Sequence, residues 1–345
     1  MKEIIDALSQ NAVLSKDELK LLLLDSDPKT SEYLRALACK KRQEIYGKDI
    51  YIRGLIEFTN YCKNNCYYCG IRASNDKASR YRLTKEEILD CCKNGYSLGF
   101  RTFVLQGGED LYYTDDIICD IVSSIKNLYP DCAITLSIGE KSKESYKAYK
   151  LAGTDRFLLR HETANSEHYS KLHPSNLTLS HRKECLYSLK ELGYQVGCGF
   201  MVGSPFQTID NIIEDLLFIK EFSPEMVGIG PFLPHKDTPF KDEHAGSVAL
   251  TLKLISIIRL LLPNVLLPAT TALGTASKNG RESGILAGCN VIMPNLSPLL
   301  VREKYLLYDG KISTGDEASE SVSHLKKSMA SIGYEIVTSK GDYKK

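Results

Sequence analysis

Three cysteines follow one another closely in the stretch NYCKNNCYYCGIRAS, residues 60–74. Cys62, Cys66 and Cys69 are spaced four and three residues apart, with only polar and aromatic residues between them. Thiolates bind zinc and iron–sulfur clusters, and both kinds of site normally take four protein ligands. A closed zinc site explains the triad poorly, because the later histidines belong to unrelated segments. On a 4Fe–4S cluster, three thiolates would leave one iron open to a substrate or cofactor.

Other polar stretches follow segments that predict β-strands, rich in branched and aromatic residues and separated by helical patterns. Eight such strands are expected, at residues 51–58, 102–107, 133–139, 156–162, 195–203, 226–234, 265–271 and 290–295. Several of the helices between them begin with caps, such as Thr84 with Glu87. Eight strands alternating with helices predict an α/β fold, a (βα)8 TIM-type barrel. An open doubly wound sheet is the alternative, because the pattern alone does not show closure.

The chain divides into three expected parts. Residues 1–48 predict an N-terminal helical extension, residues 49–312 the barrel, and residues 313–345 a C-terminal helix with a polar tail. In a barrel of this kind the active site lies where the strands end. The cysteine loop follows the first strand, and the other polar stretches are QGGED (106–110), RHETAN (160–165), PFLPHKDTP (231–239), PATTALGT (268–275) and MPN (293–295).

The composition limits the classes of function. The 345 residues carry a formal net charge of +1 and no basic block, which argues against nucleic acid as a partner. No apolar span has the length of a membrane helix, and the start has no signal-peptide core, so we expect a cytoplasmic protein that does not act at a membrane. Eleven cysteines in such a chain stay reduced. Most of the scattered ones are expected to be small buried hydrophobic residues.

The cysteine triad, with Tyr68 directly before its last member, resembles the signature of the radical S-adenosylmethionine (SAM) superfamily. The resemblance implies one 4Fe–4S cluster on Cys62, Cys66 and Cys69, whose open iron chelates the methionine end of SAM. It also implies reductive cleavage of SAM to a 5′-deoxyadenosyl radical. The protein would then hold SAM and shield the radical from water.

The same resemblance suggests which residues contact SAM. Gly107, Gly108 and Glu109 match the GGE motif of the family, in which glycines let the backbone approach and the carboxylate accepts from the SAM ammonium. Glu162 is expected near the ribose or sulfonium. Arg182 is expected to pair with the SAM carboxylate, since a guanidinium fits a carboxylate well. A structural ion pair on the barrel rim is the alternative for Arg182.

Within the superfamily, the stretches IEFTNYCKNNCYYCGIR, LLRHETAN, MVGIGPFLPHKDTP, LPATTALGT and NVIMPN resemble the HydE family of FeFe-hydrogenase maturases. The likeness runs from about residue 50 to residue 312 and implies assembly of the diiron subcluster (H-cluster) with its dithiomethylamine bridge. The implied partners are an iron–carbonyl–cyanide–cysteine substrate, the maturases HydG and HydF, and a ferredoxin or flavodoxin as reductant. The residues expected to line the substrate pocket are Arg160, Thr135, Met226, Thr270, Thr271, Met293, Tyr305 and Tyr308.

Three further expectations remain open at this point. Tyr305 and Tyr308, three residues apart, are expected on one helix face. Some HydE proteins carry a second cluster near the C-terminus, but no cysteine follows Cys289, so one cluster is expected. Cys132 lies at the start of the third predicted strand and Cys198 on the fifth, and two lone cysteines do not make a ligand set. The rival functions are another radical SAM enzyme, such as a mutase resembling 3-methylornithine synthase, and an iron–sulfur electron carrier.

Overall fold

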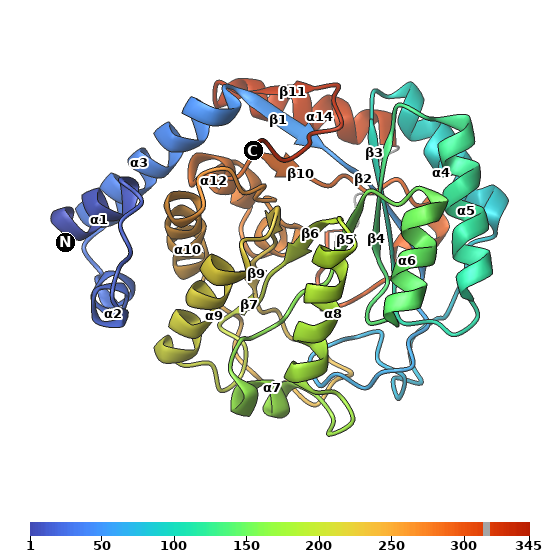
Figure 1. Cartoon of the computed structure of the whole chain (residues 1–345), viewed down its shortest axis with the longest axis horizontal. Coiled ribbons are helices and arrows are strands. Elements are labelled where there is room, and N and C mark those ends of the chain that lie inside the picture. The colour runs from blue at the N-terminus through green and yellow to red at the C-terminus, as the bar shows by residue number, and fades with distance from the viewer. Residues whose placement is uncertain (313–317) are drawn as a thin grey trace.

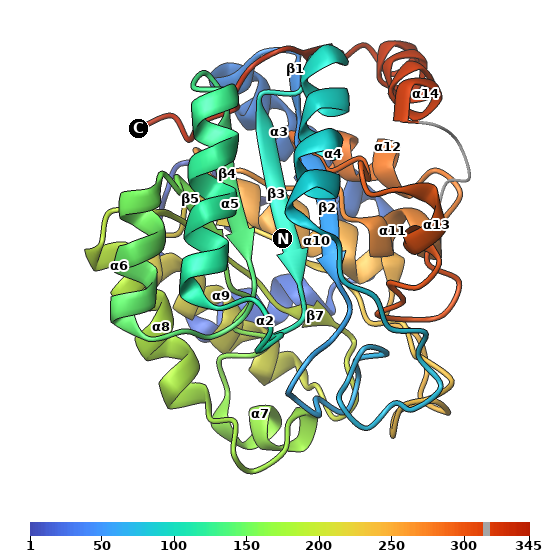
Figure 2. The ribbon, with the colours of Figure 1, turned by 90° about the vertical axis from the view of Figure 1, so that its right-hand side faces the viewer.

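Six parallel strands form one continuous sheet at the centre of the computed structural model, which describes residues 1–312 and 318–345. Their order is β2-β3-β4-β5-β6-β8, and the chain order and the sheet order agree. Their bounds are Gly54–Thr59 (β2), Thr102–Gly107 (β3), Ala133–Ser137 (β4), Arg156–Leu158 (β5), Gln195–Cys198 (β6) and Met226–Val227 (β8). Helices lie between successive strands and cover the outside of this sheet (Figures 1 and 2).

Isolated parallel bridges close the ring. They join β8 to Leu266, Pro268 to β10 (Val291–Ile292), and Asn295 to β2. Residues 266–268 therefore occupy the seventh position of the ring, and β10 with the residues after it occupies the eighth. The predicted (βα)8 barrel is confirmed, and the open sheet is excluded, because the last strand returns to the first.

Several predicted strands are shorter or divided. The first breaks at Arg53 into β1 (Asp49–Ile52) and β2, and β1 pairs with β10 and with β11 (Glu335–Val337) in a separate sheet. The ends of the fifth and sixth strands continue as β7 (Met201–Val202) and β9 (Gly230–Pro231), which pair with each other.

The break in the fifth strand follows from a close backbone contact. Gly199 has a φ of 151°, and a Cβ there would lie 2.0 Å from the carbonyl oxygen of Gly228. Only glycine permits such an approach, so the two strands touch at this point before they continue as β7 and β9.

The helices of the barrel begin largely where their caps predict. The expected Thr84–Glu87 capping box opens α4, and Thr114 and Thr208 cap α5 and α9. Strand seven was predicted too long, because Thr270 instead caps α11 and Thr271 is its first residue. The bounds are Lys85–Ser97 (α4), Asp115–Leu128 (α5), Lys143–Ala152 (α6), Ser166–Leu172 (α7), Leu179–Glu191 (α8), Ile209–Phe222 (α9), Val248–Leu261 (α10), Thr271–Ala276 (α11), Gly280–Leu286 (α12) and Leu299–Arg302 (α13).

Helices also flank the barrel in the sequence. The expected N-terminal extension forms α1 (Lys2–Ser9), α2 (Lys16–Leu24) and α3 (Pro28–Tyr46), which pack on one side of the barrel against α9, α10 and α12 (Figure 1). The expected C-terminal helix is α14 (Ala318–Ser331). The division into three parts at residues 48 and 312 stays a prediction, and residues 313–317, which begin the third part, lie outside the described residues.

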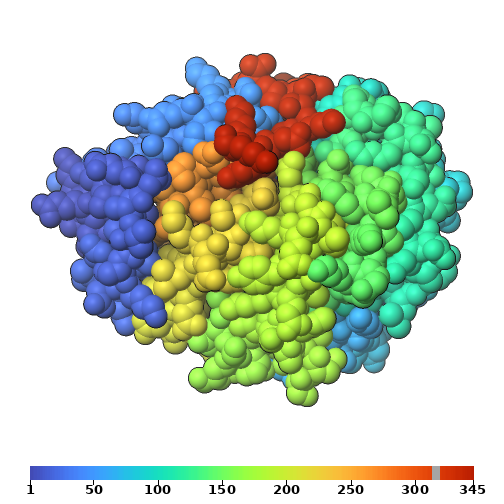
Figure 3. All heavy atoms as spheres, in the orientation of Figure 1, coloured from blue at the N-terminus to red at the C-terminus, as the bar shows by residue number. Residues whose placement is uncertain are grey.

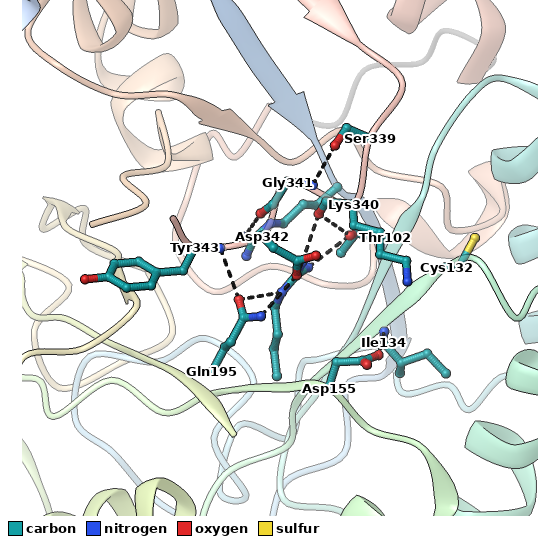
Figure 4. A network of polar contacts seen from close by, with 12 residues as sticks. Thr102, Cys132, Ile134, Asp155, Gln195, Ser339, Lys340, Gly341, Asp342 and Tyr343 are labelled. Carbon is teal, nitrogen blue, oxygen red and sulfur yellow. Dashed lines mark hydrogen bonds and ion pairs between the residues drawn. The ribbon is translucent and has the colours of Figure 1, made fainter. Parts of the chain in front are cut away.

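The end of the chain covers the starts of the barrel strands. Arg156 of β5 donates to the carbonyl oxygen of Lys340 at 2.9 Å and pairs with Asp342 at 2.5 Å, and Thr102 of β3 also donates to Lys340. Figure 4 shows this network, which Gln195 of β6 joins. The space-filling view shows the last residues, in red, on the surface beside the orange and green segments (Figure 3). The polar tail is thus bound to the barrel end opposite the cysteine loop.

Of the helices that the structure describes, none combines the length and the apolar character that a membrane crossing requires. Most of the scattered cysteines are buried as expected, namely Cys91, Cys92, Cys132, Cys185, Cys198 and Cys289. Cys39 and Cys119 are only partly buried.

Candidate active site

The cysteine loop, residues 60–82, connects β2 to α4 at the end toward which the strand arrows point (Figure 2). One side chain holds much of it in place. Arg80 donates hydrogen bonds of 2.5–3.0 Å to four carbonyl oxygens of this loop, those of Asn60, Ile71, Arg72 and Asn75. No sequence pattern indicates this role, because a single arginine in a loop is usually a solvated charge.

All three cysteines of the loop line one cavity of about 320 Å³. Burial raises the pKa of each thiol, that of Cys69 to about 12, so metal binding must release protons here. Among the described residues, no three His, Cys, Asp or Glu side chains gather closely enough to hold a single metal ion. Three thiols that line one cavity without meeting at a single point suit a larger group such as an iron–sulfur cluster, which binds each thiolate at a different iron.

The GGE motif lies directly against the cysteine loop. A Cβ on Gly108 would lie 2.1 Å from the carbonyl oxygen of Tyr61 and 2.7 Å from the Cβ of Cys62, so this contact requires glycine. The buried carboxylate of Glu109 accepts from the backbone N–H of Glu140 at 3.0 Å and pairs with Lys63 at 3.2 Å. Gly107, Gly108 and Glu109 all line the cavity, as expected for groups that contact a ligand.

Glu162 has an unusual backbone for a side chain that lines the same cavity. Its φ of 64° is in the left-handed region, which non-glycine residues rarely adopt and which is found more often at functional sites. Within the described part of the chain its Oε2 has no hydrogen-bond partner, and it forms an ion pair of 3.4 Å with the guanidinium of Arg160. A buried carboxylate oxygen that lacks a hydrogen bond and lines a cavity is suited to binding a polar ligand.

Arg182, on α8, also reaches this cavity. Its Nε lies 2.5 Å from Oε1 of Glu140, and Nη1 donates to the carbonyl oxygen of Arg160 at 2.9 Å. The structure therefore contains the ion pair considered as the alternative, while Arg182 still lines the cavity. Tyr68 lines it too, and its hydroxyl lies 3.1 Å from Nε2 of His173.

A second cavity of about 180 Å³ lies deeper in the barrel. It shares several lining residues with the first, including Arg160, Thr270 and Tyr308. Met226, Thr271 and Met293 line the deeper cavity, whereas Tyr305 lines the first.

Two expectations about this pocket need correction. Thr135 is fully buried on β4, but it is not among the lining residues of either cavity. Tyr305 and Tyr308 share no helix face, because α13 ends at Arg302 and the chain continues as a loop.

Sequence reasoning missed a buried ion pair in the deeper cavity. Nζ of Lys311 lies 2.5 Å from Oε1 of Glu57, and Asn295 donates to the other carboxylate oxygen at 2.8 Å. Lys311 also donates to the carbonyl oxygen of Tyr305 at 2.8 Å, which ties the loop after α13 to β2. In the sequence these two residues are isolated charges 254 positions apart, and nothing in the local pattern indicates that they pair.

Comparison with known proteins agrees with this geometry. The sequence pattern of the Radical SAM superfamily matches residues 56–219. HydE, the FeFe-hydrogenase maturase subunit of Thermotoga maritima, is 45% identical over 96% of this chain and 94% of its own. The chain belongs to the radical SAM superfamily. It is an enzyme of this class, and membership implies a 4Fe–4S cluster and SAM, which favours catalysis over the electron-carrier interpretation.

Three further comparisons show what else this radical SAM enzyme resembles. The 3-methylornithine synthase of Methanosarcina acetivorans is 31% identical over 90% of the chain and 87% of its own. The crystal structure of methylornithine synthase (PylB) superposes with a TM-score of 0.85 and 27% identity, covering 97% of each chain. The maturase HydG shares the fold, with a TM-score of 0.79 and 22% identity over 96% of this chain and 74% of its own.

Proposed function

We propose that this radical SAM enzyme is a maturase of the HydE type that acts in assembly of the diiron subcluster of FeFe-hydrogenase and its dithiomethylamine bridge. The observation that carries the proposal is the 45% identity to HydE along nearly the whole chain. It is supported by a cavity lined by both the cysteine loop and the polar strand ends.

In this proposal, Cys62, Cys66 and Cys69 are the ligands of the one 4Fe–4S cluster. Bound together there, the cluster and SAM would supply a 5′-deoxyadenosyl radical. Glu109 would accept a hydrogen bond from the SAM ammonium. Gly108 allows the end of β3 to lie against the cysteine loop, which brings Glu109 close to the proposed cluster. The free carboxylate oxygen of Glu162 would accept from a hydroxyl group of SAM.

The remaining proposed SAM contacts, Arg182 and Tyr68, line the same cavity. Arg182 would pair with the SAM carboxylate through the part of the guanidinium that Glu140 leaves free. Tyr68 would help to close the cavity beside the cysteine loop, since its ring packs edge-on against His173. Burial of these groups strengthens each polar contact and excludes water.

The deeper cavity would hold the iron–carbonyl–cyanide–cysteine substrate. Both carboxylate oxygens of Glu57 are already bound, by Lys311 and Asn295. Arg160 is therefore the charged side chain available to an anionic complex. Met226 and Met293 would pack against the substrate with soft apolar side chains. Hydroxyl groups would come from Thr270, Thr271 and Tyr308. Tyr305 would contact the substrate from the first cavity. Thr135 would not touch the substrate and would only help to position β4.

A mutase resembling 3-methylornithine synthase is the second candidate, because the structural likeness to that enzyme covers 97% of both chains. Its substrate class would be an amino acid such as lysine, whose side-chain ammonium needs an acceptor. Among the described residues that line the deeper cavity, Glu57 is the one carboxylate, and Lys311 already neutralises it. The charges of the cavity thus favour an anionic substrate.

Formation of 5′-deoxyadenosine tests the proposal. The reconstituted enzyme is given SAM and dithionite, and the rate is compared without substrate, with cysteine bound to an iron–carbonyl–cyanide unit, and with lysine. The proposal expects slow formation alone and faster formation with the iron complex. Turnover that depends on lysine and ignores the iron complex would support the mutase instead. In the cell, the proposed partners are HydG, HydF and a ferredoxin or flavodoxin, in the cytoplasm.

A further inference from the structure

Exposed apolar side chains gather on the outer side of the cysteine loop. Tyr61 is 36% exposed, and Leu111 and Tyr112, in the turn after β3, are 73% and 56% exposed. Arg82 joins the two segments, since its guanidinium lies 3.8 Å from the ring centre of Tyr61 and 4.8 Å from that of Tyr112. We call Tyr61, Lys63, Arg82, Leu111 and Tyr112 the loop patch.

The loop patch lies directly over one of the proposed cluster ligands. Tyr61 and Lys63 flank Cys62 in the sequence. The turn after β3 is held against the same cysteine, because a Cβ on Gly108 would lie 2.7 Å from that of Cys62. The loop patch is therefore exposed surface that adjoins one proposed cluster ligand.

The ion pairs that the cysteine loop forms direct positive charge outward. In each of three pairs, the cation is far more exposed than the carboxylate. The exposed fractions are 34% and 3% for Arg82 and Asp110, 46% and 8% for Lys63 and Glu109, and 74% and 13% for Lys77 and Asp237.

The composition of the loop has the same bias. Residues 61–82 contain five lysines and arginines and one aspartate, in a chain whose net charge is only +1. An apolar centre with exposed cations at its rim is the composition of a protein docking site that selects an acidic partner.

We propose that the loop patch is the docking site of the reductant, a small acidic one-electron carrier protein whose redox group lies near its acidic surface. This inference rests on the proposed function, which requires an external electron at the cysteine loop. The partner would place its redox group over Cys62, with Leu111 and Tyr112 buried in the contact and Lys63, Lys77 and Arg82 attracting its carboxylates. One electron passes from the reduced carrier to the cluster, and no bond is exchanged.

The test variant is Leu111→Asp, which places a carboxylate at the centre of the patch without disturbing a buried group. Its matched control is Leu151→Asp, since Leu151 is 79% exposed near the end of α6, just before β5 begins. The control therefore makes the same chemical change at the opposite end of the barrel.

Binding of oxidised flavodoxin to the reconstituted enzyme is measured first, at low ionic strength, because it requires no SAM cleavage. We expect Leu111→Asp to weaken binding at least about tenfold, within the range of electrostatic effects on association. Leu151→Asp should bind as the wild type does. Equal binding by Leu111→Asp, or no binding by the wild type, would overturn the docking site.

Formation of 5′-deoxyadenosine is then driven either by reduced flavodoxin or by dithionite. Leu111→Asp should lower the flavodoxin-driven rate and leave the dithionite-driven rate unchanged, because dithionite needs no docking surface. Lys77→Gln, a milder variant that removes an exposed cation of the cysteine loop, should reduce the salt dependence of the flavodoxin-driven rate. Absence of SAM cleavage with dithionite would refute the proposed function, whereas the binding measurement would still decide the docking site.

Discussion

The guanidinium of Arg182 lies against the carboxylate of Glu140, with Nε 2.5 Å from Oε1 and both side chains less than a tenth exposed. The hydrogen bond from Arg182 to the carbonyl oxygen of Arg160 fixes the same group from another side. Arg182 also lines the cavity of the cysteine loop. An internal ion pair and a ligand contact therefore do not exclude one another here, because a guanidinium has five N–H donors.

Arg182→Leu should lower both stability and SAM affinity. Removing one partner of a buried ion pair costs about 3–5 kcal/mol, because the other charge stays buried. Thermal unfolding and SAM titration measure the two effects. Glu140→Gln is the control, since it retains Arg182 and a neutral acceptor, and it should bind SAM nearly as the wild type does. If Arg182→Leu loses stability but binds SAM normally, Arg182 is only a structural residue.

Gly139→Ala should displace Glu109 and weaken SAM binding. Gly139 has a φ of +76°, and a Cβ there would lie 2.1 Å from Cγ of Glu109. Gly193 is the matched control, because its φ is also +76° and no atom of the described residues lies within 4 Å of its Cβ position. Both alanine variants carry the strain of a left-handed backbone, about 1 kcal/mol or more, and only the first moves Glu109. Equal SAM affinity of the two variants in a titration would contradict the proposed role of Glu109.

Alanine at Cys62, Cys66 or Cys69 should abolish cluster binding and SAM cleavage. The reconstituted wild type should contain about four irons per chain, the content of one cubane cluster. Cys198→Ala is the control, because Cys198 is buried in the wall of the deeper cavity. This variant should have the iron content of the wild type. A wild-type content near twice this value would reveal a second cluster, with Cys132 and Cys198 as the first ligands to test.

The sequence predicted the barrel well, because alternation of strands and helices is a local pattern and caps such as Thr84 mark where helices begin. It predicted a full seventh strand where the structure has bridges at Leu266 and Pro268, since an apolar run alone does not show how many residues pair. It missed β11, whose three residues pair with β1 at the other end of the chain.

For the site, the cysteine spacing and the GGE motif are local signals in the sequence. The residues of both motifs line the same cavity. Arg80 and the Lys311–Glu57 pair were missed for a different reason. A charged residue that turns inward to bind a loop or another charge has the same sequence signature as a solvated one. Contacts between residues 254 positions apart depend on the closure of the whole barrel.

Lys311→Met should destabilise the enzyme by about 3–5 kcal/mol, because among the described residues it leaves the buried carboxylate of Glu57 with Asn295 alone as a partner. Denaturant unfolding measures the loss. The double variant Glu57→Gln with Lys311→Met should recover part of it, since no unpaired charge then remains. If the double variant is no more stable than Lys311→Met alone, the ion pair is not what holds the loop after α13 to β2.

Arg160→Leu should spare SAM binding and slow the reaction that depends on the iron complex. The side chain of Arg160 lines both cavities and forms an ion pair of 3.4 Å with Glu162. Its Nε and Nη2 are buried without a hydrogen-bond partner among the described residues, so an anionic complex in the deeper cavity would be a second partner.

In the Arg160→Leu variant, the rate of 5′-deoxyadenosine formation without substrate should stay unchanged, while the increase caused by the iron complex should shrink. Loss of a charge-assisted hydrogen bond, about 1.5–3 kcal/mol, predicts a ten- to hundredfold higher requirement for the complex. Arg160→Lys keeps the positive charge without the planar guanidinium, so it should restore part of the increase. SAM affinity is measured in both variants, because Glu162 loses a neighbour in the first. A normal response of Arg160→Leu to the iron complex would remove Arg160 from the substrate pocket and with it the electrostatic argument for an anionic substrate.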